Sequence, residues 1–326
     1  MNFFERHLMT VLVVGRNFRN IVWFRRKIGH WPRILFPQTY NEKLLWRKLF
    51  DHSPVIARLT DKLQVKIYFA DLCPNLNIVS PLWVGERAED IPDALLNQDV
   101  IVKTNHGCAY NIIVRDIDYD RATLNKTVNG WLDTTYGAKH IEWAYSQITP
   151  KVFVEPMLRS KTDQIPYEFN FEVCSGRIIS CFVIGAKASG SPKSGIFDAS
   201  GKRLSTTVRS VPDPEDQLPQ DTELPAVYQQ AASYAQMLGR DHDNVRVDFM
   251  CVDDEIYGCE MTFYCMSGRG NLFSDARLYQ ELSKAWDLRR SWFLNTHHSG
   301  WLGRYADTLN LKLTDPQQRY IKELSQ

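Results

Sequence analysis

Hydrophobic and polar residues alternate along several short segments of the chain, and this period of two predicts β-strands. The sharpest case covers residues 245–252 and 255–263, which alternate on either side of Asp253 and Asp254. Two strands joined by so short a turn form an antiparallel hairpin. Five further strands are expected at residues 99–104, 111–114, 152–154, 168–174 and 178–184. The last two flank a Ser-Gly pair and predict a second hairpin.

Apolar residues recur at helical spacing in other segments. Asn41 is expected to begin a helix that runs through Leu44 to Phe50, with short helices continuing to about Ala70. Three later helices are expected within residues 122–145, 224–238 and 278–288, and a Trp-rich tail follows. Residues 186–222 are rich in Ser, Gly, Pro and Asp, so they are expected to form long surface loops, one of which could fold over a site.

The first 36 residues interleave basic and apolar side chains at a spacing that predicts one or two amphipathic helices. The basic members are Arg6, Arg16, Arg19, Arg25, Arg26, Lys27 and Arg33. Packing on the rest of the protein is the favoured interpretation, and contact with an anionic lipid surface or a partner is the alternative. The chain has no run of about 18 apolar residues and no apolar secretory signal, so we expect no membrane-spanning segment.

Composition narrows the functional classes. The chain has 326 residues, enough for one large or two to three small domains, and 44% of them are hydrophobic. Its 39 basic and 38 acidic residues nearly cancel, so no overall field attracts nucleic acid and any polyanion binding has to be local. The seven cysteines are scattered and lack the paired spacing of zinc or redox sites. We therefore expect reduced thiols and a cytoplasmic protein.

The hairpin at residues 245–263 carries the best candidate for chemistry. Arg246 and Asp248 project to one face of the first strand, and Glu260 and Thr262 share a face of the second. Counting back from the turn brings Asp248 close to Glu260. Two carboxylates at this range raise each other's pKa unless a cation lies nearby, and hard oxygen ligands suit magnesium that carries a polyphosphate. Geometry alone leaves open the alternative that both polar faces simply meet water.

These two strands resemble those of the ATP-grasp family, in which an Arg-x-Asp strand and a Glu-x-Asn strand hold the magnesium ions of ATP. The chain reads Arg246-Val-Asp248 and Glu260-Met-Thr262, so threonine stands where asparagine is usual. The resemblance implies that Asp248, Glu260 and Thr262 bind Mg²⁺, with weaker coordination by the threonine hydroxyl. It also implies that Arg246 stabilises the charge of the transferred phosphoryl group or of an acyl phosphate.

Segments upstream of the hairpin also resemble ATP-grasp motifs, and they occur in the order that the family requires. Lys62, in the Asp61-Lys62 pair, resembles a lysine that contacts ATP phosphate in D-alanine-D-alanine ligases. Lys103, at a strand end, resembles the second phosphate lysine, and the small-residue loop after it contains His106 and Gly107. Lysine suits both places as a point charge on a long stem. His106 would either carry protons or support the loop through hydrogen bonds.

Two more segments complete the nucleotide site that the resemblance implies. One segment resembles the hinge whose backbone binds adenine, and it consists of Glu155, Pro156, Met157 and Leu158. Glu168 resembles the carboxylate that binds the ribose hydroxyls. A Gly-rich turn follows the second metal strand, where ligases of this superfamily bind the acid substrate, and Arg269 in that turn is the expected carboxylate-binding residue.

Within the superfamily the chain most resembles the TupA-like branch, which is tied to teichuronopeptide and other surface-polysaccharide synthesis. The likeness covers roughly residues 37–285 and rests on segments such as Thr39-Tyr-Asn-Glu-Lys43. The branch usually has an Asp-Tyr-Lys-like segment where this chain reads Glu168-Phe-Asn170, so a lysine is missing. If that lysine met ATP or substrate, this chain does so differently.

The implied fold is α+β: the ATP-grasp fold, with three subdomains and ATP held between two antiparallel sheets. The expected parts are a basic amphipathic segment, an N-terminal subdomain, a central lid subdomain, a C-terminal nucleotide and metal subdomain, and a tail. They cover residues 1–36, 37–98, 99–166, 167–290 and 291–326.

The implied activity is that of an ATP- and Mg²⁺-dependent carboxylate-amine ligase that works through an acyl phosphate, with Lys103, Arg246 and Arg269 as catalytic residues. Its partners would be ATP, a uronic acid or glycan carboxylate, and the amine of an amino acid or peptide. It could also contact the inner face of a membrane or glycan-assembly proteins. Three alternatives stay open: an ATP-grasp kinase that phosphorylates a hydroxyl, a glycosyltransferase of polysaccharide assembly, and a non-catalytic nucleotide-binding module.

Overall fold

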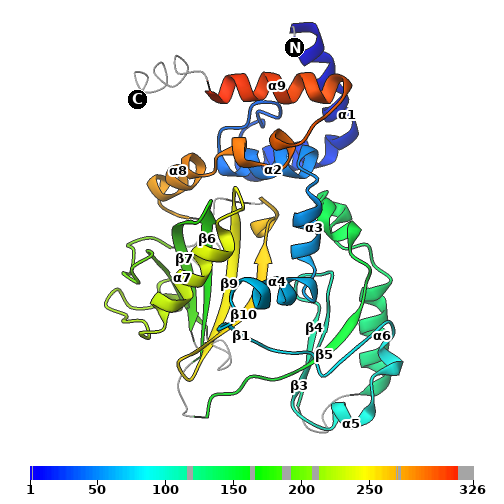
Figure 1. Cartoon of the computed structure of the whole chain (residues 1–326), viewed down its shortest axis with the longest axis vertical. Helices are drawn as coiled ribbons and strands as arrows, with labels where there is room; N and C mark the ends of the chain where they lie inside the picture. The colour runs from blue at the N-terminus through cyan, green and yellow to red at the C-terminus, as the bar shows by residue number, and fades with distance from the viewer. Residues whose placement is uncertain are drawn as a thin grey trace.

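Two sheets and a layer of helices make up the part of the protein that the computed structural model describes, namely residues 1, 3–115, 120–161, 166–185, 192–207, 213–268, 270 and 273–314. The larger sheet consists, in spatial order, of β1 (Asn77–Ile78), β10 (Glu255–Thr262), β9 (Val245–Val252), β6 (Tyr167–Cys174), β7 (Arg177–Gly185) and β8 (Lys193–Phe197). The smaller sheet consists of β2 (Trp83–Gly85), β5 (Val152–Pro156), β3 (Val100–Thr104) and β4 (Asn111–Val114). Both sheets lie below the helical layer (Figure 1).

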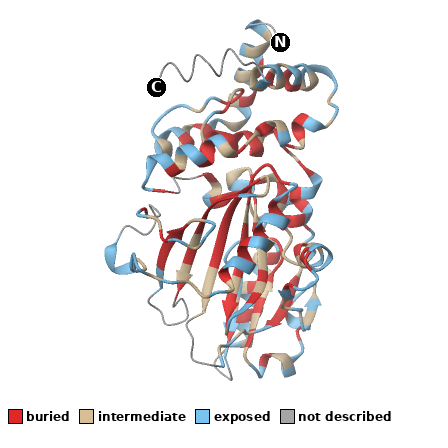
Figure 2. Ribbon diagram, turned by 60° about the vertical axis from the view of Figure 1, so that its left-hand side comes forward, coloured by how far each residue is buried: buried red, intermediate tan, exposed pale blue. Residues whose placement is uncertain are grey.

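Alternation along the central strands divides the larger sheet into an apolar and a polar face. The apolar face packs on α4 (Gln64–Leu72) and α7 (Tyr228–Gly239), and side chains such as Phe249 are buried there. Gly258 on β10 is required for this packing, because a Cβ there would come within 2.6 Å of the Phe69 ring. Figure 2 shows buried residues running through these strands. The opposite face of the central strands carries polar side chains.

A β-bulge in β10 sets the orientation of its last residues. From the turn outward, β9 and β10 pair in step as far as Phe249 and Gly258, but the next partners are Asp248 and Glu260, so Cys259 is an extra residue. In an unbroken ladder Cys259 would lie opposite Asp248, and Glu260 would lie opposite Val247 on the apolar face. The extra residue shifts the pairing by one position. Glu260 therefore shares a face with Asp248.

Both hairpins expected from the sequence are confirmed. β9 and β10 join through Asp253 and Asp254, with φ angles of 51° and 60°, and β6 and β7 join through Ser175 and Gly176, with φ angles of 53° and 81°. Two successive left-handed residues give the turn whose twist matches that of the strands it connects. These turns fix the register of β6, β7, β9 and β10.

The smaller sheet has a core of its own. It packs on α6 (Arg121–Leu132), and Val102, Val128 and Val154 are fully buried between the sheet and this helix. The short stretch of chain after α4 contributes to both sheets, because β1 pairs with β10 while β2 pairs with β5. A single-turn helix, α5 (Asp93–Leu96), precedes β3.

The helical layer lies over one end of the larger sheet (Figure 1) and consists of α1 (Phe3–Ile28), α2 (Tyr40–Phe50), α8 (Ala276–Ala285) and α9 (Gly300–Thr314). A capping box begins α2, because the Thr39 side chain accepts from the Glu42 N–H and the Glu42 carboxylate accepts from the Thr39 N–H. The prediction that Asn41 begins this helix was wrong. Asn41 lies inside the helix, and its side chain donates to the carbonyls of Gly268 and Gly270.

Most other expected elements are confirmed within a few residues. The strands expected at 99–104, 111–114 and 152–154 are β3, β4 and β5, and the short helices near residue 60 are α3 (Pro54–Thr60) and α4. The segment at 122–145 is α-helical only as far as Leu132, and two 3-10 helices follow at Ala138–His140 and Trp143–Gln147. Five strands and α-helices were missed: the short β1, β2 and α5 ahead of β3, β8 inside the expected loop region, and α9 in the expected tail. Residues 186–191 and 208–212 of the loop region lie outside the described residues.

All seven cysteines are free thiols, and five of them are buried. None of the described helices is long and apolar enough to cross a membrane.

Candidate functional site

Six polar side chains form two rows across the polar face of the larger sheet. The first row is Asn170, Asp248 and Glu260, and the second is Glu172, Arg246 and Thr262. Directly opposite residues of an antiparallel ladder lie on the same face, a few ångströms apart. The β9–β10 hairpin thus brings together all four residues that its sequence pattern singled out, and β6 adds two more.

Arg246 and Asp248 make the tightest contact within these rows. The guanidinium donates from Nε to Oδ1 at 2.7 Å and from Nη2 to Oδ2 at 2.6 Å, a bidentate pair. Nη2 also donates to Thr262 Oγ1 at 3.2 Å and lies 3.8 Å from Glu260 Oε1. The Thr262 hydroxyl lies 3.4 Å from an oxygen of each carboxylate. We refer to Arg246, Asp248, Glu260 and Thr262 as the hairpin cluster.

The two carboxyls of the hairpin cluster have opposite pKa shifts. Burial raises the pKa of Asp248 to about 7, although Arg246 opposes the shift. Burial also acts on Glu260, but Lys62 and Arg246 outweigh it and lower the pKa of that carboxyl. Lys62 Nζ lies 3.7 Å from Glu260 Oε2. Asp248 therefore holds a proton more readily than Glu260, because burial dominates at Asp248 while Lys62 and Arg246 compensate the charge of Glu260.

A second ionic cluster connects the two sheets. Glu155 at the end of β5 accepts a hydrogen bond from Lys103 of β3 and forms an ion pair with Lys66 of α4, each at 2.7 Å. Burial opposes ionisation of Glu155, but these two lysines outweigh it and lower the pKa of the carboxyl. Because α4 packs on the larger sheet, Lys66 ties that sheet to the smaller one. We refer to Lys66, Lys103 and Glu155 as the lysine bridge.

Lys62 makes a further connection between the sheets. Its N–H donates to the Asn105 carbonyl at 3.1 Å and its ammonium group donates to the Gly107 carbonyl. Both acceptors belong to the loop after β3, while the same ammonium group faces Glu260 of β10. Lys62 thus holds the loop expected to cover phosphate close to the hairpin cluster.

The charges of the hairpin cluster and the lysine bridge both act on Cys259, the extra residue of the bulge. Burial raises the pKa of its thiol to about 12, with Lys103 and Lys66 opposing the shift and Asp248 and Glu168 adding to it. Such effects weaken with distance, so these groups surround a common region. The two clusters and Glu168 therefore lie around Cys259, in the region where Lys62 joins β10 to the loop after β3.

The two predicted residues of the loop after β3 differ in their surroundings. His106 is only 1% exposed, and its Nε2 lies 3.1 Å from the Trp131 carbonyl. Burial lowers the pKa of its imidazole, which favours a neutral side chain that supports the loop over one that carries protons. Gly107 approaches the Tyr110 ring so closely that a Cβ would lie 2.3 Å from it. The loop conformation therefore requires glycine at this position.

The expected adenine hinge lies at the end of β5. The side chain of Glu155 is committed to the lysine bridge, and the Met157 N–H donates to the Asp99 carbonyl at 3.2 Å. The Met157 N–H is therefore occupied and Pro156 has no N–H, so among these four residues Leu158 is the remaining candidate for a backbone donor beyond the strand. Glu168, the expected ribose ligand, is half-buried near the start of β6.

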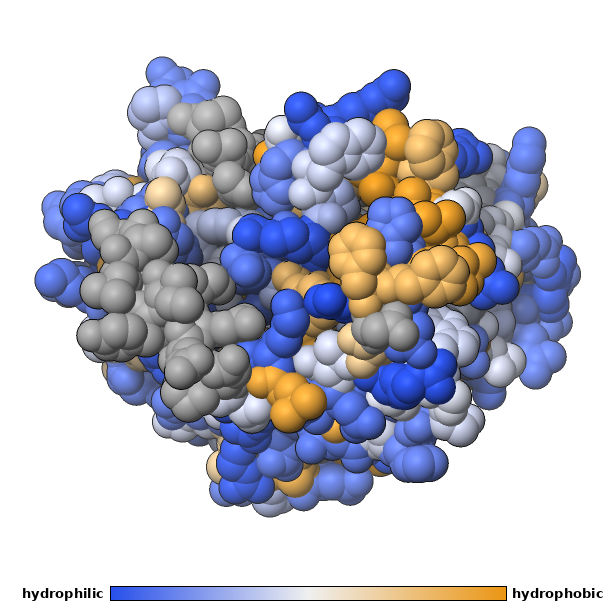
Figure 3. Space-filling model, turned by 90° about the horizontal axis from the view of Figure 1, so that it is seen from above, coloured by the Kyte–Doolittle hydropathy of each residue, from blue (hydrophilic) through white to orange (hydrophobic). Residues whose placement is uncertain are grey.

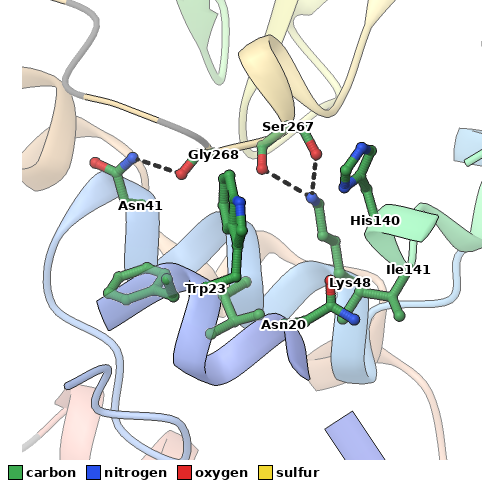
Figure 4. A pocket seen from close by; sticks show the side chains of 10 residues that line it. Asn20, Trp23, Asn41, Lys48, His140, Ile141, Ser267 and Gly268 are labelled. Carbon is green, nitrogen blue, oxygen red and sulfur yellow. Dashed lines mark hydrogen bonds between the residues drawn. The ribbon is translucent and has the colours of Figure 1, made fainter. Parts of the chain in front are cut away.

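The Gly-rich turn after β10 is anchored by α2. Lys48 Nζ donates to the Ser267 carbonyl at 2.9 Å and to its hydroxyl at 2.8 Å, and Asn41 Nδ2 donates to the Gly268 carbonyl at 3.1 Å (Figure 4). These contacts border a small pocket between α1 and α2. Arg269, the residue expected to bind the acid substrate, lies outside the described residues.

Three residues of this site were missed in the sequence: Lys66, Asn170 and Glu172. Lys66 follows Lys62 by four residues, a spacing that places side chains on one side of a helix. Asn170 and Glu172 follow Glu168 at a period of two, so the alternation along this strand already placed them on its face. Asn170, which stands where a lysine was expected, lies in the row of the hairpin cluster carboxylates.

The donors of the hairpin cluster fit a magnesium ion. Asp248 and Glu260 offer carboxylate oxygens and Thr262 a hydroxyl oxygen, and Mg²⁺ prefers oxygen ligands while taking others from phosphates and water. The raised pKa of Asp248 indicates that a second negative charge is unfavourable here unless a cation compensates it. Among the described residues, no three or more His, Cys, Asp or Glu side chains are placed to hold a metal ion by themselves. Phosphate or water would have to complete the coordination.

The two sheets, with cations and carboxylates converging between them, are the architecture of an ATP-grasp protein. Residues 42–283 match the family model described as TupA-like ATPgrasp, which covers most of the chain. The protein therefore belongs to the TupA-like ATP-grasp family. This match confirms the family and the fold class that the sequence motifs predicted.

Several solved structures show a distant likeness to the chain. The ATP-grasp ligase PsnB, complexed with a phosphomimetic variant of its minimal precursor, Mg and ADP, is 16% identical with a TM-score of 0.37, over 73% of this chain and 62% of that chain. D-Alanine-D-Alanine Ligase from Helicobacter pylori is 16% identical with a TM-score of 0.38, over 70% and 61%. L-amino acid ligase from Bacillus licheniformis is 10% identical with a TM-score of 0.40, over 68% and 48%.

The chain thus spans less than two thirds of the length of each of these three proteins. Among curated proteins, none matches it.

Proposed function

We propose that the protein is an ATP- and Mg²⁺-dependent carboxylate-amine ligase that works through an acyl phosphate. The observation that carries the proposal is the convergence of the hairpin cluster, Lys62 and the lysine bridge on one space between two sheets. Carboxylate oxygens in that space suit a magnesium ion, and the cations beside them suit a polyphosphate. Membership of the ATP-grasp family supports ATP as that polyphosphate.

In this proposal the triphosphate of ATP lies between Lys62 and Lys103. Their side chains are 21% and 28% exposed, so a phosphate oxygen can reach either ammonium group from the open space. When Lys103 turns toward phosphate, Lys66 still compensates the buried Glu155. Glu168 would bind the ribose hydroxyls, and the backbone after β5 would contact adenine.

The proposed reaction has two steps. A substrate carboxylate oxygen attacks the γ-phosphorus of ATP, the bond from that phosphorus to the bridging oxygen breaks, and ADP leaves. An amine nitrogen then attacks the acyl carbon, phosphate leaves, and the nitrogen loses a proton. The product is an amide.

The residues around the hairpin cluster would supply charge compensation for this reaction. Magnesium, when held by Asp248, Glu260 and Thr262, would neutralise phosphate charge. Arg246 would donate hydrogen bonds to the transferred phosphoryl group, where negative charge develops, and Lys103 would act with it.

We propose that the acid is a uronic acid of a surface polysaccharide or of its precursor and that the amine belongs to an amino acid or peptide. The TupA-like family assignment and the resemblance to its surface-polysaccharide members support this choice. Arg269, after the second metal strand, is the proposed ligand of the acid.

The test is an assay of ADP, free phosphate and product mass with ATP, Mg²⁺, a panel of uronic acids or oligosaccharides, and the amino acids. We expect phosphate release that needs both an acid and an amine. Asp248→Asn should slow this release about 10³-fold, the effect of losing a main electrostatic contact in the transition state. Asp254→Asn is the matched control, because this exposed carboxyl lies in the same hairpin but at its turn.

The other outcomes separate the alternatives. ADP formation with a phosphorylated product and no free phosphate would identify a kinase. Binding of a sugar nucleotide in place of ATP would identify a glycosyltransferase. Binding of ATP without turnover in any mixture would favour a non-catalytic module, and no binding of ATP would refute the proposal.

A further inference from the structure

The outward face of α1 carries large apolar side chains that the described part of the protein does not cover. In the first half of the helix the exposed fractions are 77% for Phe3, 73% for Phe4, 50% for Leu8, 55% for Val11 and 54% for Leu12. Met9 and Val13, on the other side, are buried in the core of the helical layer. Packing of α1 on its own domain, the interpretation favoured from the sequence, is therefore confirmed for one side of the helix only.

These exposed side chains form a continuous surface. Phe4, Leu8, Val11 and Leu12 follow one another at the three- and four-residue spacing of one helix face. Seen from above, apolar residues gather into one patch on the helical layer, with hydrophilic residues on its flanks (Figure 3). Soluble proteins rarely expose a contiguous apolar patch of this kind unless it binds something. We refer to this face as the α1 patch.

The second half of α1 is basic. Asn17 has non-helical angles, φ −120° and ψ 21°, and separates the two halves. Beyond it the exposed basic residues are Arg19, Arg25, Arg26 and Lys27. The helix holds six basic residues and one acidic residue, a charge of +5, whereas the whole chain carries +1. The acidic residue, Glu5, lies 3.2 Å from Arg304 of α9.

We propose that α1 docks the protein on the surface of an anionic lipid membrane. Helices that lie in the membrane interface pair an apolar face, buried at the level of the acyl chains, with cations that meet the lipid phosphates. The α1 patch supplies the apolar face, and the basic half of α1 supplies the cations. Because none of the described helices is long and apolar enough to cross a membrane, the contact is with the surface.

Charge disfavours a second copy of the chain as the occupant of the patch. Pairing of two α1 helices would bring two surfaces of charge +5 together, and like charges at an interface oppose association. Lipid phosphates are negatively charged, so they attract the basic helix where a second copy would repel it. The neighbouring surface also suits lipid, since a groove of about 590 Å³ beside the patch is lined by both apolar and cationic side chains, Phe3, Phe36, Arg6 and Arg33 among them.

The position of α1 leaves the candidate site open. The helix lies in the helical layer, and the two sheets extend away from it on the other side of that layer (Figure 1). A membrane under α1 would therefore leave the space between the sheets in contact with water.

Flotation of the full chain with vesicles tests the proposal. The vesicles contain phosphatidylcholine alone or with about one third phosphatidylglycerol, and we expect binding to the anionic vesicles that weakens with salt. Phe4→Ser with Leu8→Ser should lower partitioning at least about tenfold, because two large apolar side chains no longer enter the interface. Arg19→Gln with Arg26→Gln should lower it about 25-fold, since each charge near the surface contributes about fivefold.

Matched controls lie outside α1. Ile113→Ser removes a side chain of β4 that is 51% exposed, and Arg240→Gln with Arg277→Gln removes two exposed arginines from elsewhere in the protein. These variants should bind vesicles like the unaltered chain. Thermal unfolding should show that every variant is folded, as expected for changes at exposed positions.

Three outcomes would overturn the proposal. One is no binding to anionic vesicles, and another is equal binding to neutral and anionic vesicles. The third is a concentration-dependent dimer in light scattering that Phe4→Ser with Leu8→Ser abolishes, because the occupant would then be a second copy. None of these measurements uses ATP turnover, so they stand or fall independently of the proposed reaction.

Discussion

Two groups of charged side chains in this protein are similar in composition and differ in their access to water. One is the hairpin cluster on β9 and β10. The other centres on Arg47 of α2, which donates to Asp243 Oδ1 at 2.6 Å and to the Phe263 carbonyl at 2.9 Å. Its guanidinium lies 4.3 Å from the centre of the Trp286 ring, and Asp51 lies 4.0 Å from its Nε. We refer to Arg47, Asp51, Asp243 and Trp286 as the Arg47 cluster.

The Arg47 cluster is closed. The side chains of Arg47 and Asp51 are 0% and 1% exposed. Asp51 accepts from the Phe293 N–H at 2.8 Å, and the Trp286 indole donates to Asp243 at 2.6 Å. These bonds join α2 to three later segments of the chain, so the cluster holds the helical layer together.

The hairpin cluster is open. The side chain of Glu260 is 35% exposed, and its nearest lysine, Lys62, is 21% exposed. Yet burial raises the pKa of one carboxyl to about 7 in each cluster, Asp248 here and Asp51 in the Arg47 cluster. A raised pKa therefore does not distinguish the proposed binding site from the structural contact in this protein, whereas the exposure of their side chains does differ.

The largest effect on stability is expected from Arg47→Met. The change leaves Asp243 and Asp51 buried without their cation, and breaking a buried pair in this way costs about 3–5 kcal/mol of unfolding free energy. Urea denaturation measures it. The matched control is Arg240→Met at an exposed position, which should change the unfolding free energy by less than about 0.5 kcal/mol. A loss below about 1 kcal/mol in Arg47→Met would mean that the cluster is not the structural contact described here.

The same substitution in the hairpin cluster should have a different outcome. Arg246→Met should slow ATP turnover about 10²- to 10³-fold, because a donor to the transferred phosphoryl group is lost. It should destabilise the fold less than Arg47→Met does, since Arg246 and Glu260 are 23% and 35% exposed and water can reach the charge left unpaired. The test is to measure ATP turnover and urea unfolding for both variants, since Arg246→Met should mainly reduce turnover and Arg47→Met should mainly reduce stability. Equal stability losses would erase the distinction between the two clusters.

The pH dependence of stability should reveal both carboxyls with raised pKa, and magnesium should affect one of them. A pKa raised above the unfolded value means that the folded state binds its proton more tightly. Unfolding free energy is therefore highest when the carboxyl is protonated, and it falls as pH rises from about 4 to about 7. We expect a fall of about 1–3 kcal/mol from each of Asp248 and Asp51, and each Asp→Asn variant should remove its own part.

Magnesium separates the two contributions. At about pH 7, added Mg²⁺ should raise the unfolding free energy by about 1 kcal/mol or more in the unaltered chain and in Asp51→Asn. Asp248→Asn should show no such gain. Stabilisation by Mg²⁺ that survives in Asp248→Asn would place the ion elsewhere.

The smallest effect is expected from restoring the usual residue at Thr262. Thr262→Asn offers an amide oxygen, a better magnesium ligand than a hydroxyl, and should lower the Mg²⁺ concentration for half-maximal turnover a few-fold. Thr262→Val, a match in shape without the oxygen, should raise it. Titration of turnover with Mg²⁺ at saturating ATP measures both, and an equal response to the two substitutions would exclude a ligand role.

The local parts of this site could be predicted from the sequence. A two-residue turn fixes the register of a hairpin, so counting residues brings Glu260 within one position of Asp248, although counting alone pairs Asp248 with Cys259 and misses the bulge that puts the two carboxylates on one face. The alternation along β6 could likewise have placed Asn170 and Glu172 on the same face. These predictions depend only on neighbouring strands.

The contacts between distant segments could not be predicted in this way. The lysine bridge requires that α4 pack on one sheet and that Glu155 end a strand of the other, and no local pattern encodes that arrangement. β8 was missed for a similar reason, since it is a short strand whose place depends on pairing with β7. α9 was missed because Gly300 and Gly303 weaken its first turn, although Tyr305 and Leu309 are buried at helical spacing.

The bulge at Cys259 lets two successive residues of β10 lie opposite one residue of β9. It is visible in the burial pattern as a spacing of three between the buried positions Gly258 and Met261, where an unbroken strand would have two. Deleting Cys259 would leave a regular ladder in which Glu260 still lies opposite Asp248, so the two carboxylates would stay on one face. What the extra residue adds is the local bend and twist of β10, which set the angle at which Glu260 and Thr262 approach β9. A shorter strand would therefore keep the same neighbours at this site and change only their aim.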